Sequence, residues 1–262
     1  MLQIEEVGEN NRQWIVENLK EDVVRNVFAF YDLQYDPQHS IMYVAFENGR
    51  LKGYILIYTA LDFPSVILES DVEAADMLVG HAPANHFIMH AMPNLLATIE
   101  GRFPNARHYD ENWMLVKKGQ ARFFKSNDVR RLNVADGSRL ASLLSTRRDR
   151  PAANDEHCAD SIRMMPMYGV FIDGELVSFA GSFIQTPEIW MIGGVYTNPS
   201  CRNMGYATLA TSAVTEEALT RSDQAALFVR SDNYSAIVAY EKIGYRKIGE
   251  RLWVDVGTGM KP

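Results

Sequence analysis

The hydrophobic and polar positions of this chain follow two patterns, a period of two residues typical of strands and a spacing of three to four residues typical of helices. In the first half they predict strands and intervening helices at 65–69, 72–79, 86–91, 93–101 and 112–116, in the order β-α-β-α-β. In the second half they predict the same order at 189–197, 205–220, 225–229, 234–243 and 246–256. The series therefore occurs twice.

A hairpin precedes each series, and the two hairpins align without gaps. Residues 42–51 contain Asn48-Gly49 and residues 167–176 contain Asp173-Gly174, dipeptides typical of two-residue hairpin turns. The remaining predicted elements are returning strands and preceding helices, at 52–59, 177–185, 10–30, 136–144 and 155–164. This repeat predicts an α+β fold with two domains in tandem, each a mixed, mostly antiparallel sheet flanked by helices.

A loop suited to an anion lies between the 189–197 strand and the 205–220 helix. Its sequence is Arg202-Asn203-Met204-Gly205-Tyr206-Ala207-Thr208, after the strand end Val195-Tyr196-Thr197. Free backbone N–H groups and the positive end of the helix dipole meet at such a loop, and Arg202 adds a fixed positive charge. Gly205 permits close approach of the backbone to a ligand. The predicted ligand is a pyrophosphate.

A second motif follows, with the sequence Asn233-Tyr234-Ser235-Ala236-Ile237-Val238-Ala239-Tyr240-Glu241-Lys242-Ile243-Gly244-Tyr245. The pattern R-x-x-G-x-A after V-Y-T-x-P, followed by N-x-x-A and Y-E-K-x-G-Y, resembles the acetyl-CoA motifs of the GNAT acyltransferase superfamily. Within that superfamily, the motifs of this chain are similar to those of the glycine N-acyltransferase-like branch. The resemblance implies a GNAT fold, acetyl-CoA as co-substrate and acyl transfer to an amine, with no metal ion required.

The first half lacks the anion loop. It passes from Glu69-Ser70-Asp71 directly into the 72–79 helix, and Glu69, Asp71 and Glu73 would repel a pyrophosphate. We interpret residues 1–118 as a degenerate GNAT-like domain, against the alternative of an unrelated α+β cap that shares the hairpin. Residues 119–262 would form the catalytic domain, after a linker through 117–120 and with a first strand near 129–134.

The resemblance also implies roles for single residues. Backbone N–H groups from Asn203 to Thr208 would hold the pyrophosphate, Val195 to Thr197 would pair with the pantetheine arm, and Asn233, Ala236 and Tyr240 would contact the coenzyme from the other side. Gly193-Gly194 indicates a bulge or a close backbone approach, at which the Val195 N–H would stabilise the oxyanion. Tight packing against a neighbouring helix is the alternative reason for these two glycines.

Tyr240 is the candidate proton donor to the departing thiolate, because a phenol with a reference pKa of about 10 stays protonated at neutral pH. The alternative is that Tyr240 packs on the coenzyme or in the core. Many relatives carry a glutamate on the strand before the bulge, where this chain has Met191. Glu188 is the remaining candidate base, acting through a water, or it is an ordinary strand-edge charge.

Charge and cysteine content narrow the class of protein. The 26 basic and 33 acidic residues give a net charge of −7, which argues against general nucleic-acid or anionic-membrane binding. No apolar run approaches the roughly 20 residues that span a bilayer, the start of the chain lacks a signal-peptide pattern, and Cys158 and Cys201 offer no disulfide framework. We expect a cytoplasmic protein, monomeric or homodimeric.

The basic run 147–150 is interpreted as a solvated loop, or as part of the entrance for the acceptor amine.

The leading hypothesis is an N-acetyltransferase that moves an acetyl group from acetyl-CoA to the primary amine of a small molecule. A second hypothesis, favoured by the missing strand glutamate, is an acyl-CoA-binding sensor or scaffold without turnover. A third is an acyltransferase that uses another acyl-CoA or a protein amine. The sequence leaves the acceptor open.

Overall fold

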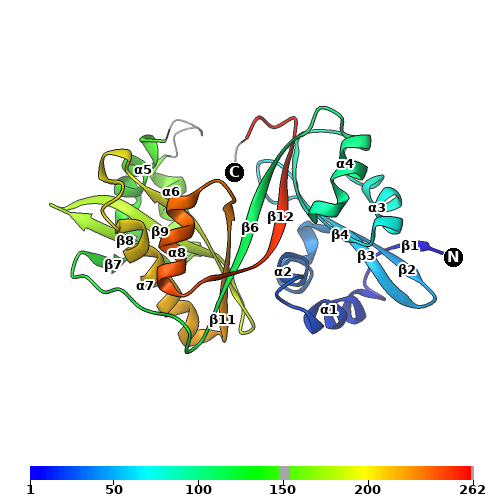
Figure 1. The fold of residues 1–262 in the computed structure, drawn as a ribbon, viewed down its shortest axis with the longest axis horizontal. Helices are drawn as coiled ribbons and strands as arrows, with labels where there is room; N and C mark the ends of the chain where they lie inside the picture. Colours follow the sequence, from blue (N-terminus) through cyan, green and yellow to red (C-terminus); the bar gives the residue numbers. More distant parts are fainter. Residues whose placement is uncertain (148–153, 261–262) are drawn as a thin grey trace. The chain divides into compact units, whose positions relative to one another are not determined.

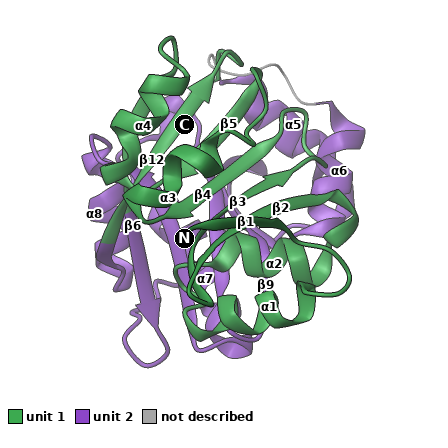
Figure 2. Cartoon of the chain, turned by 90° about the vertical axis from the view of Figure 1, so that its right-hand side faces the viewer, with its two compact units in different colours: residues 1–112, 249–262 green, residues 113–248 purple. Residues whose placement is uncertain are grey.

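The computed structural model describes residues 1–147 and 154–260, and the chain divides into two compact units. The first unit comprises Met1–Asn112 with Gly249–Pro262, and the second comprises Trp113–Ile248 (Figure 2). Most of the basic run 147–150 lies outside the described residues, which include only Arg147 of it. Within the described residues, no helix combines the length and the apolar character that a bilayer crossing requires.

The sheet of the first unit is antiparallel except where β4 pairs with β5 in parallel. Its strands, drawn in Figure 1, are β1 (Gln3–Glu6), β2 (Ser40–Glu47), β3 (Arg50–Tyr58), β4 (Ser65–Ser70), β5 (Phe87–Ala91) and the parts of β6 (Arg107–Lys117) and β12 (Arg246–Val256) within its bounds. Its helices are α1 (Arg12–Glu21), α2 (Val27–Tyr35), α3 (Val72–Val79) and α4 (Leu96–Arg102), with 3-10 turns η1 (Pro37–His39) and η2 (Pro93–Leu95).

The sheet of the second unit repeats this arrangement, with β10 and β11 as its parallel pair. Its own strands are β7 (Val129–Arg131), β8 (Met167–Ile172), β9 (Glu175–Gln185), β10 (Trp190–Thr197) and β11 (Gln224–Arg230). Its helices are α5 (Gly137–Ser145), α6 (Asp155–Met164), α7 (Tyr206–Arg221) and α8 (Tyr234–Ile243), with turns η3 (Val134–Asp136) and η4 (Pro199–Cys201). The predicted α+β tandem of mixed, mostly antiparallel sheets is confirmed.

The two hairpins use the same kind of turn. Asn48 and Gly49 have φ of 51° and 73°, and Asp173 and Gly174 have φ of 51° and 84°. Two consecutive positive φ values define the type I′ turn, whose twist matches that of the flanking strands. The Asn-Gly and Asp-Gly dipeptides therefore occupy the turns that their sequences predict.

The helix predicted over 10–30 is instead two helices, α1 and α2. The Asp22 carboxylate accepts a hydrogen bond from the Arg25 N–H at 3.2 Å, and the Asn26 amide donates to the Leu19 carbonyl at 3.2 Å. Short polar side chains of this kind compete with the helical backbone for its own donors and acceptors. The chain accordingly turns between the two helices, a break that the hydrophobic spacing alone does not reveal.

The boundaries of the two compact units differ from those of the two predicted domains, 1–118 and 119–262. From Gly249 onward the chain belongs to the first unit, where β12 pairs antiparallel with β5 from Leu252–Ala91 to Val256–Phe87. Conversely, the end of β6 belongs to the second unit, in which the rings of Trp113 and Phe228 lie 5.4 Å apart. The last strand of each half thus contributes to the other unit. Periodicity shows which residues form a strand and not which sheet receives it.

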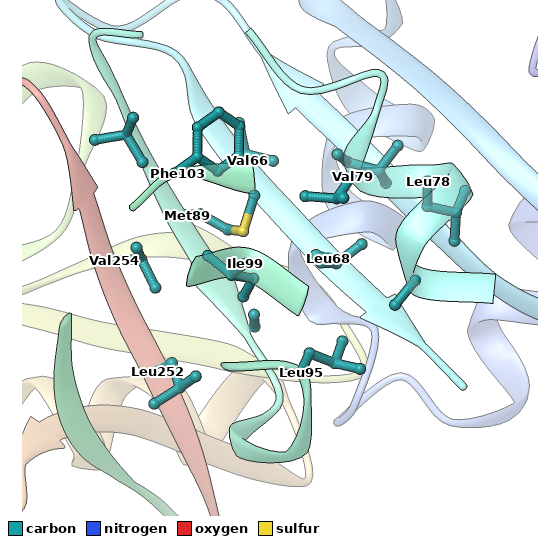
Figure 3. Close-up of a cluster of buried hydrophobic side chains, with 14 of the residues drawn as sticks. Val66, Leu68, Leu78, Val79, Met89, Leu95, Ile99, Phe103, Leu252 and Val254 are labelled. Carbon is teal, nitrogen blue, oxygen red and sulfur yellow. The ribbon is translucent and has the colours of Figure 1, made fainter. Parts of the chain in front are cut away.

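The C-terminal strand completes the core of the first unit. Leu252 and Val254 on β12 are buried with Val66, Met89 and Ile99 in one hydrophobic cluster (Figure 3). Apolar burial of this kind is the main favourable contribution to folding. The stability of the first unit therefore depends on residues more than a hundred positions away in sequence.

We predict that Leu252→Ala, which empties a site that is 1% exposed, lowers the free energy of unfolding by about 2–5 kcal/mol. The matched control is Leu61→Ala in the same unit, where the side chain is 59% exposed and the expected change is below about 0.5 kcal/mol. Urea unfolding followed by circular dichroism measures both. Equal effects of the two substitutions would contradict the assignment of β12 to this core.

Candidate functional site

Strand β10 loses its partner on one edge partway along its length. Parallel pairing with β11 joins Trp190 to Ala225 and Met191 to Ala226, and in the described parts of the chain no further register pair links the two strands. Pairing with β9 continues to Thr197, interrupted by a register shift between Gly193 and Tyr196. Gly194, within this shift, has φ of 65°. The bulge predicted from the paired glycines is confirmed.

Gly193 and Gly194 are glycines for different structural reasons. Gly194 requires its positive φ, a conformation that side-chain-bearing residues rarely adopt. A Cβ on Gly193 would lie 2.7 Å from the ring of Phe183, so a side chain here would require that ring to move. The alternative of tight packing therefore holds for Gly193, although the neighbour is a side chain from β9 and not a helix.

Beyond the bulge, alternate residues of β10 present their backbone groups to opposite edges. The Asn198 N–H donates to the Val177 carbonyl at 2.9 Å, and the Tyr196 carbonyl accepts from the Ser178 hydroxyl at 3.2 Å. Tyr196 and Asn198 therefore face β9. Because successive residues of a strand alternate, the Val195 and Thr197 backbone groups face the opposite edge, where pairing with β11 has ended.

The loop after β10 leads into α7 with its backbone donors uncovered. Asn203 and Gly205 have φ of 64° and 82°, and the N-cap Gly205 has no side chain to cap the helix. The first helical bond runs from the Leu209 N–H to the Gly205 carbonyl at 3.1 Å. Within the described residues, the N–H groups of Tyr206, Ala207 and Thr208 have no acceptor, so they are available to an anion.

Glycine at position 205 is required by conformation and not by space. A Cβ there would meet nothing within 4 Å, but φ of 82° would strain any other residue. Arg202, which is exposed, donates from Nε to the Thr197 carbonyl at 3.4 Å. Its guanidinium is thereby held beside the loop as a positive charge, while exposed Met204 lies between the two positive-φ residues.

The side chains of Tyr196 and Thr197 are held by the protein. The Tyr196 hydroxyl lies 2.8 Å from the hydroxyl of Thr146 at the end of α5, and the Arg147 guanidinium lies 4.6 Å from the Tyr196 ring. The Thr197 hydroxyl lies 2.7 Å from that of Ser178. These contacts fix the strand end, so that its backbone is the part presented to a ligand.

The second motif has structural roles of its own. Asn233 caps α8, because its side-chain oxygen accepts from the Ala236 N–H at 3.3 Å. Gly244, with φ of 113°, lies where a Cβ would come within 2.6 Å of the Gln120 carbonyl, so the linker crosses closely over the end of α8.

Tyr240 lies in the core of the second unit. It is buried, and its ring lies 6.1 Å from that of Tyr245 in an edge-to-face arrangement. Burial raises the pKa of the Tyr240 phenol well above its ordinary value, because the charged phenolate is poorly solvated there. The phenol is therefore fully protonated at neutral pH.

Glu188 lies in the bend before β10, seven residues from Val195 in sequence. Its role as a base stays a prediction. Met191, at the position of the glutamate found in many relatives, is buried.

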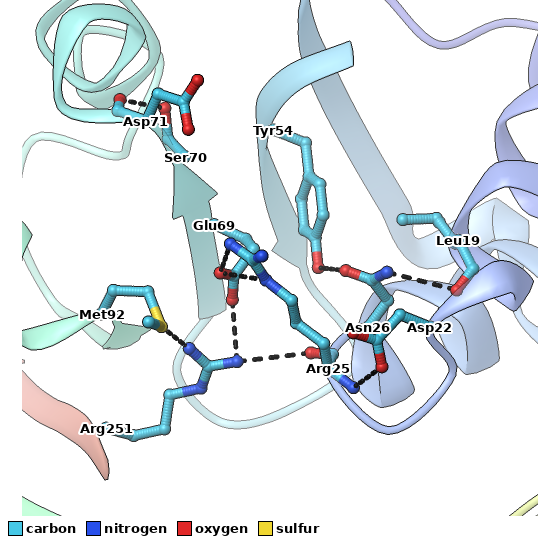
Figure 4. A network of polar contacts seen from close by, with 10 residues as sticks. All are labelled: Leu19, Asp22, Arg25, Asn26, Tyr54, Glu69, Ser70, Asp71, Met92 and Arg251. Atoms are coloured by element: carbon cyan, nitrogen blue, oxygen red, sulfur yellow. Dashed lines mark hydrogen bonds and ion pairs between the residues drawn. The ribbon is translucent and has the colours of Figure 1, made fainter. Parts of the chain in front are cut away.

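The equivalent region of the first unit is occupied by an ion-pair network (Figure 4). Extending the hairpin alignment without gaps pairs Glu69 with Gly194. The buried Glu69 carboxylate lies 2.6 Å from Arg25 and 2.8 Å from Arg251. Strand β4 pairs with β3 without a register shift and with β5 over four residues, and α3 begins directly after Asp71. Neither the bulge nor the anion loop exists there.

Comparison with known proteins identifies this arrangement. Residues 167–254 match the family model described as FR47-like protein. The chain is similar to a solved Drosophila protein at 14% identity and a TM-score of 0.73, over 98% of this chain and 99% of that one. It is also similar to a tandem GNAT protein from the clavulanic acid biosynthesis pathway, at 12% identity and a TM-score of 0.58 over 98% of each chain.

A third similar structure is a GCN5-related N-acetyltransferase-like protein from Streptococcus suis, at 14% identity and a TM-score of 0.62, over 95% of this chain and 100% of that one. No curated protein sequence matches the chain. The chain therefore has the tandem GNAT fold, and the FR47-like match contains both sequence motifs, at 202–208 and 233–245. The glycine N-acyltransferase-like branch stays a prediction.

We predict that Gly205→Glu abolishes binding of acetyl-CoA, because a side chain at the mouth of the loop adds strain, bulk and a negative charge beside the pyrophosphate. Gly174→Glu is the matched control, since Gly174 has φ of 84° and equally open surroundings in the same unit. Isothermal titration calorimetry compares the two. Retained affinity in Gly205→Glu, or equal loss in both variants, would exclude the loop as the pyrophosphate site.

Proposed function

We propose that this protein is an N-acyltransferase that transfers an acyl group, acetyl in the simplest case, from coenzyme A to the primary amine of a small molecule. The observation that carries this proposal is the unpaired edge of β10 beyond Met191, followed directly by the uncapped start of α7. An open strand edge can pair with an amide-bearing arm, and an uncapped helix start can bind phosphate. Here the two follow each other on one segment of the chain. Coenzyme A carries both groups, the amides in its pantetheine arm and the phosphates in its pyrophosphate.

The backbone of the second unit would bind the coenzyme in three places. The N–H groups from Asn203 to Thr208, with Arg202, would hold the pyrophosphate. The Val195 and Thr197 backbone groups would pair with the amides of the pantetheine arm. Asn233 and Ala236 at the start of α8 would contact the coenzyme from the side opposite to β10.

In the proposed reaction the amine nitrogen attacks the thioester carbonyl carbon, and a C–N bond forms while the carbonyl oxygen becomes negative. The Val195 N–H faces the open edge of β10 and would donate to that oxygen, which stabilises it most when the charge has developed. The carbonyl re-forms as the C–S bond breaks, and the thiolate takes a proton from Tyr240. The Tyr240 phenol carries this proton at neutral pH. The proton lost by the attacking nitrogen passes to solvent, from which the Tyr240 phenolate is reprotonated.

No residue is assigned as the general base. An amine that arrives partly deprotonated needs none, and the net charge of −7 is compatible with attraction of a cationic amine. Free Cys158 and Cys201 support a reducing, cytoplasmic setting, and we infer a monomer or homodimer without nucleic-acid or membrane partners.

A second candidate function is an acyl-CoA-binding sensor or scaffold without turnover. It is favoured by buried Met191 at the place of the expected glutamate. A third is transfer of a different acyl group, or transfer to a protein amine, with the same coenzyme site.

One experiment separates enzyme from sensor. The protein is incubated with acetyl-CoA and a panel of small primary amines, and free thiol is followed with time. Amine-dependent thiol release is expected for the enzyme. Tight binding of acetyl-CoA without release from any amine would favour the sensor, and failure to bind acetyl-CoA would refute both.

We predict that Tyr240→Phe lowers kcat by about 100-fold or more, since general acid catalysis typically contributes 10²–10⁴-fold, while the Kd for acetyl-CoA stays unchanged. The control is Tyr234→Phe on the same helix, a position that is 75% exposed and at which no effect is expected. Steady-state kinetics and calorimetry provide the two quantities. Unchanged turnover in Tyr240→Phe would leave Tyr240 with a packing role only.

A further inference from the structure

The phenyl ring of Phe183 lies on the bulged segment of β10. The ring carbons come within 2.7 and 2.9 Å of the place where a Cβ of Gly193 would be, so the ring rests directly on the Gly193 backbone. Phe183 is nevertheless 40% exposed. A large apolar side chain is therefore held at a defined place two residues from Val195 and can still contact a ligand.

The position of this ring is set by a second bulge, on β9. The register passes from Met191–Ile184 to Ile192–Ser182, which leaves Phe183 as the extra residue on its strand. The buried Ser182 hydroxyl lies 2.9 Å from the carbonyl oxygens of both Ile184 and Met191 and so stabilises the bulge. Bulges next to functional sites commonly redirect a side chain, and here the redirected side chain is Phe183.

The order of the proposed coenzyme contacts defines the direction of the acyl chain. The pyrophosphate loop follows β10, and Val195 lies upstream of the loop, so a coenzyme along this edge runs toward lower residue numbers. Atoms beyond the thioester carbonyl at Val195 would then continue toward Gly194 and Gly193. Gly193 lies about 7 Å from Val195 along the strand, and at this point Phe183 covers the backbone.

We infer that Phe183 limits the length of the acyl group, which makes the donor a short-chain acyl-CoA. This inference rests on the proposed function, because it uses the coenzyme placement argued there. The Phe183 ring packs on Gly193 and occupies the volume that additional methylene groups would enter. A site that is closed by a fixed ring disfavours longer chains through overlap, and removal of the ring provides apolar space for them.

The test measures Kd by isothermal titration calorimetry for acetyl-CoA, butyryl-CoA and hexanoyl-CoA with the full chain. In the wild-type protein, hexanoyl-CoA should bind at least about tenfold more weakly than acetyl-CoA, and Phe183→Ala should reduce that ratio at least about tenfold. Phe183→Leu should give an intermediate ratio. Phe123→Ala, at an aromatic position of the same unit that is also 40% exposed, should leave the ratio unchanged.

The outcomes distinguish this inference from the proposed function. If the wild-type protein binds none of the three thioesters, the proposed function fails, and the inference fails with it. If acetyl-CoA binds but Phe183→Ala and Phe183→Leu keep the wild-type ratio, the proposed function stands and the role of Phe183 is refuted. A wild-type preference for hexanoyl-CoA would also refute it. Circular dichroism of each variant verifies that the fold is retained.

Discussion

Backbone hydrogen bonding requires partners for both edges of a buried strand, and β10 gives up its partner on one edge after Met191. The divergence is possible because β9 holds the strand from the other side, across a bulge that only a positive φ at Gly194 allows. The backbone groups of Val195 and the N–H of Thr197 are thereby left for a ligand, while the Thr197 carbonyl accepts from Arg202. The anion loop begins only a few residues later, so both proposed coenzyme contacts depend on this one departure from regular pairing.

The first unit shows the same topology without that departure. Its β4 keeps regular register with β3 and stays paired with β5, and the buried Glu69 is neutralised by Arg25 and Arg251. A buried carboxylate needs such partners, because an unpaired charge in the interior is strongly unfavourable. Arg251 comes from β12, so the C-terminal strand supplies both apolar packing and charge to this unit. In the function that we propose, the coenzyme chemistry is confined to the second unit.

Local physical rules made much of the candidate site predictable. Asn-Gly, Asp-Gly and paired glycines adopt positive φ values that few other residues tolerate. The hairpin turns and the bulge can therefore be predicted from these dipeptides alone. The N-cap position of Gly205 and the start of α7 were likewise predictable. The contact of Phe183 with Gly193 was not predictable, because it joins two strands through a bulge.

The sequence by itself determined the kinds of element, their order, the repeat of that order and the loop between β10 and α7, because each depends on residues close together in the chain. Tertiary structure alone decided which sheet receives the last strand of each half and that Glu69 is paired with two arginines. Those features arise from contacts between distant residues, and the free energy of such contacts depends on burial and geometry that no local pattern contains.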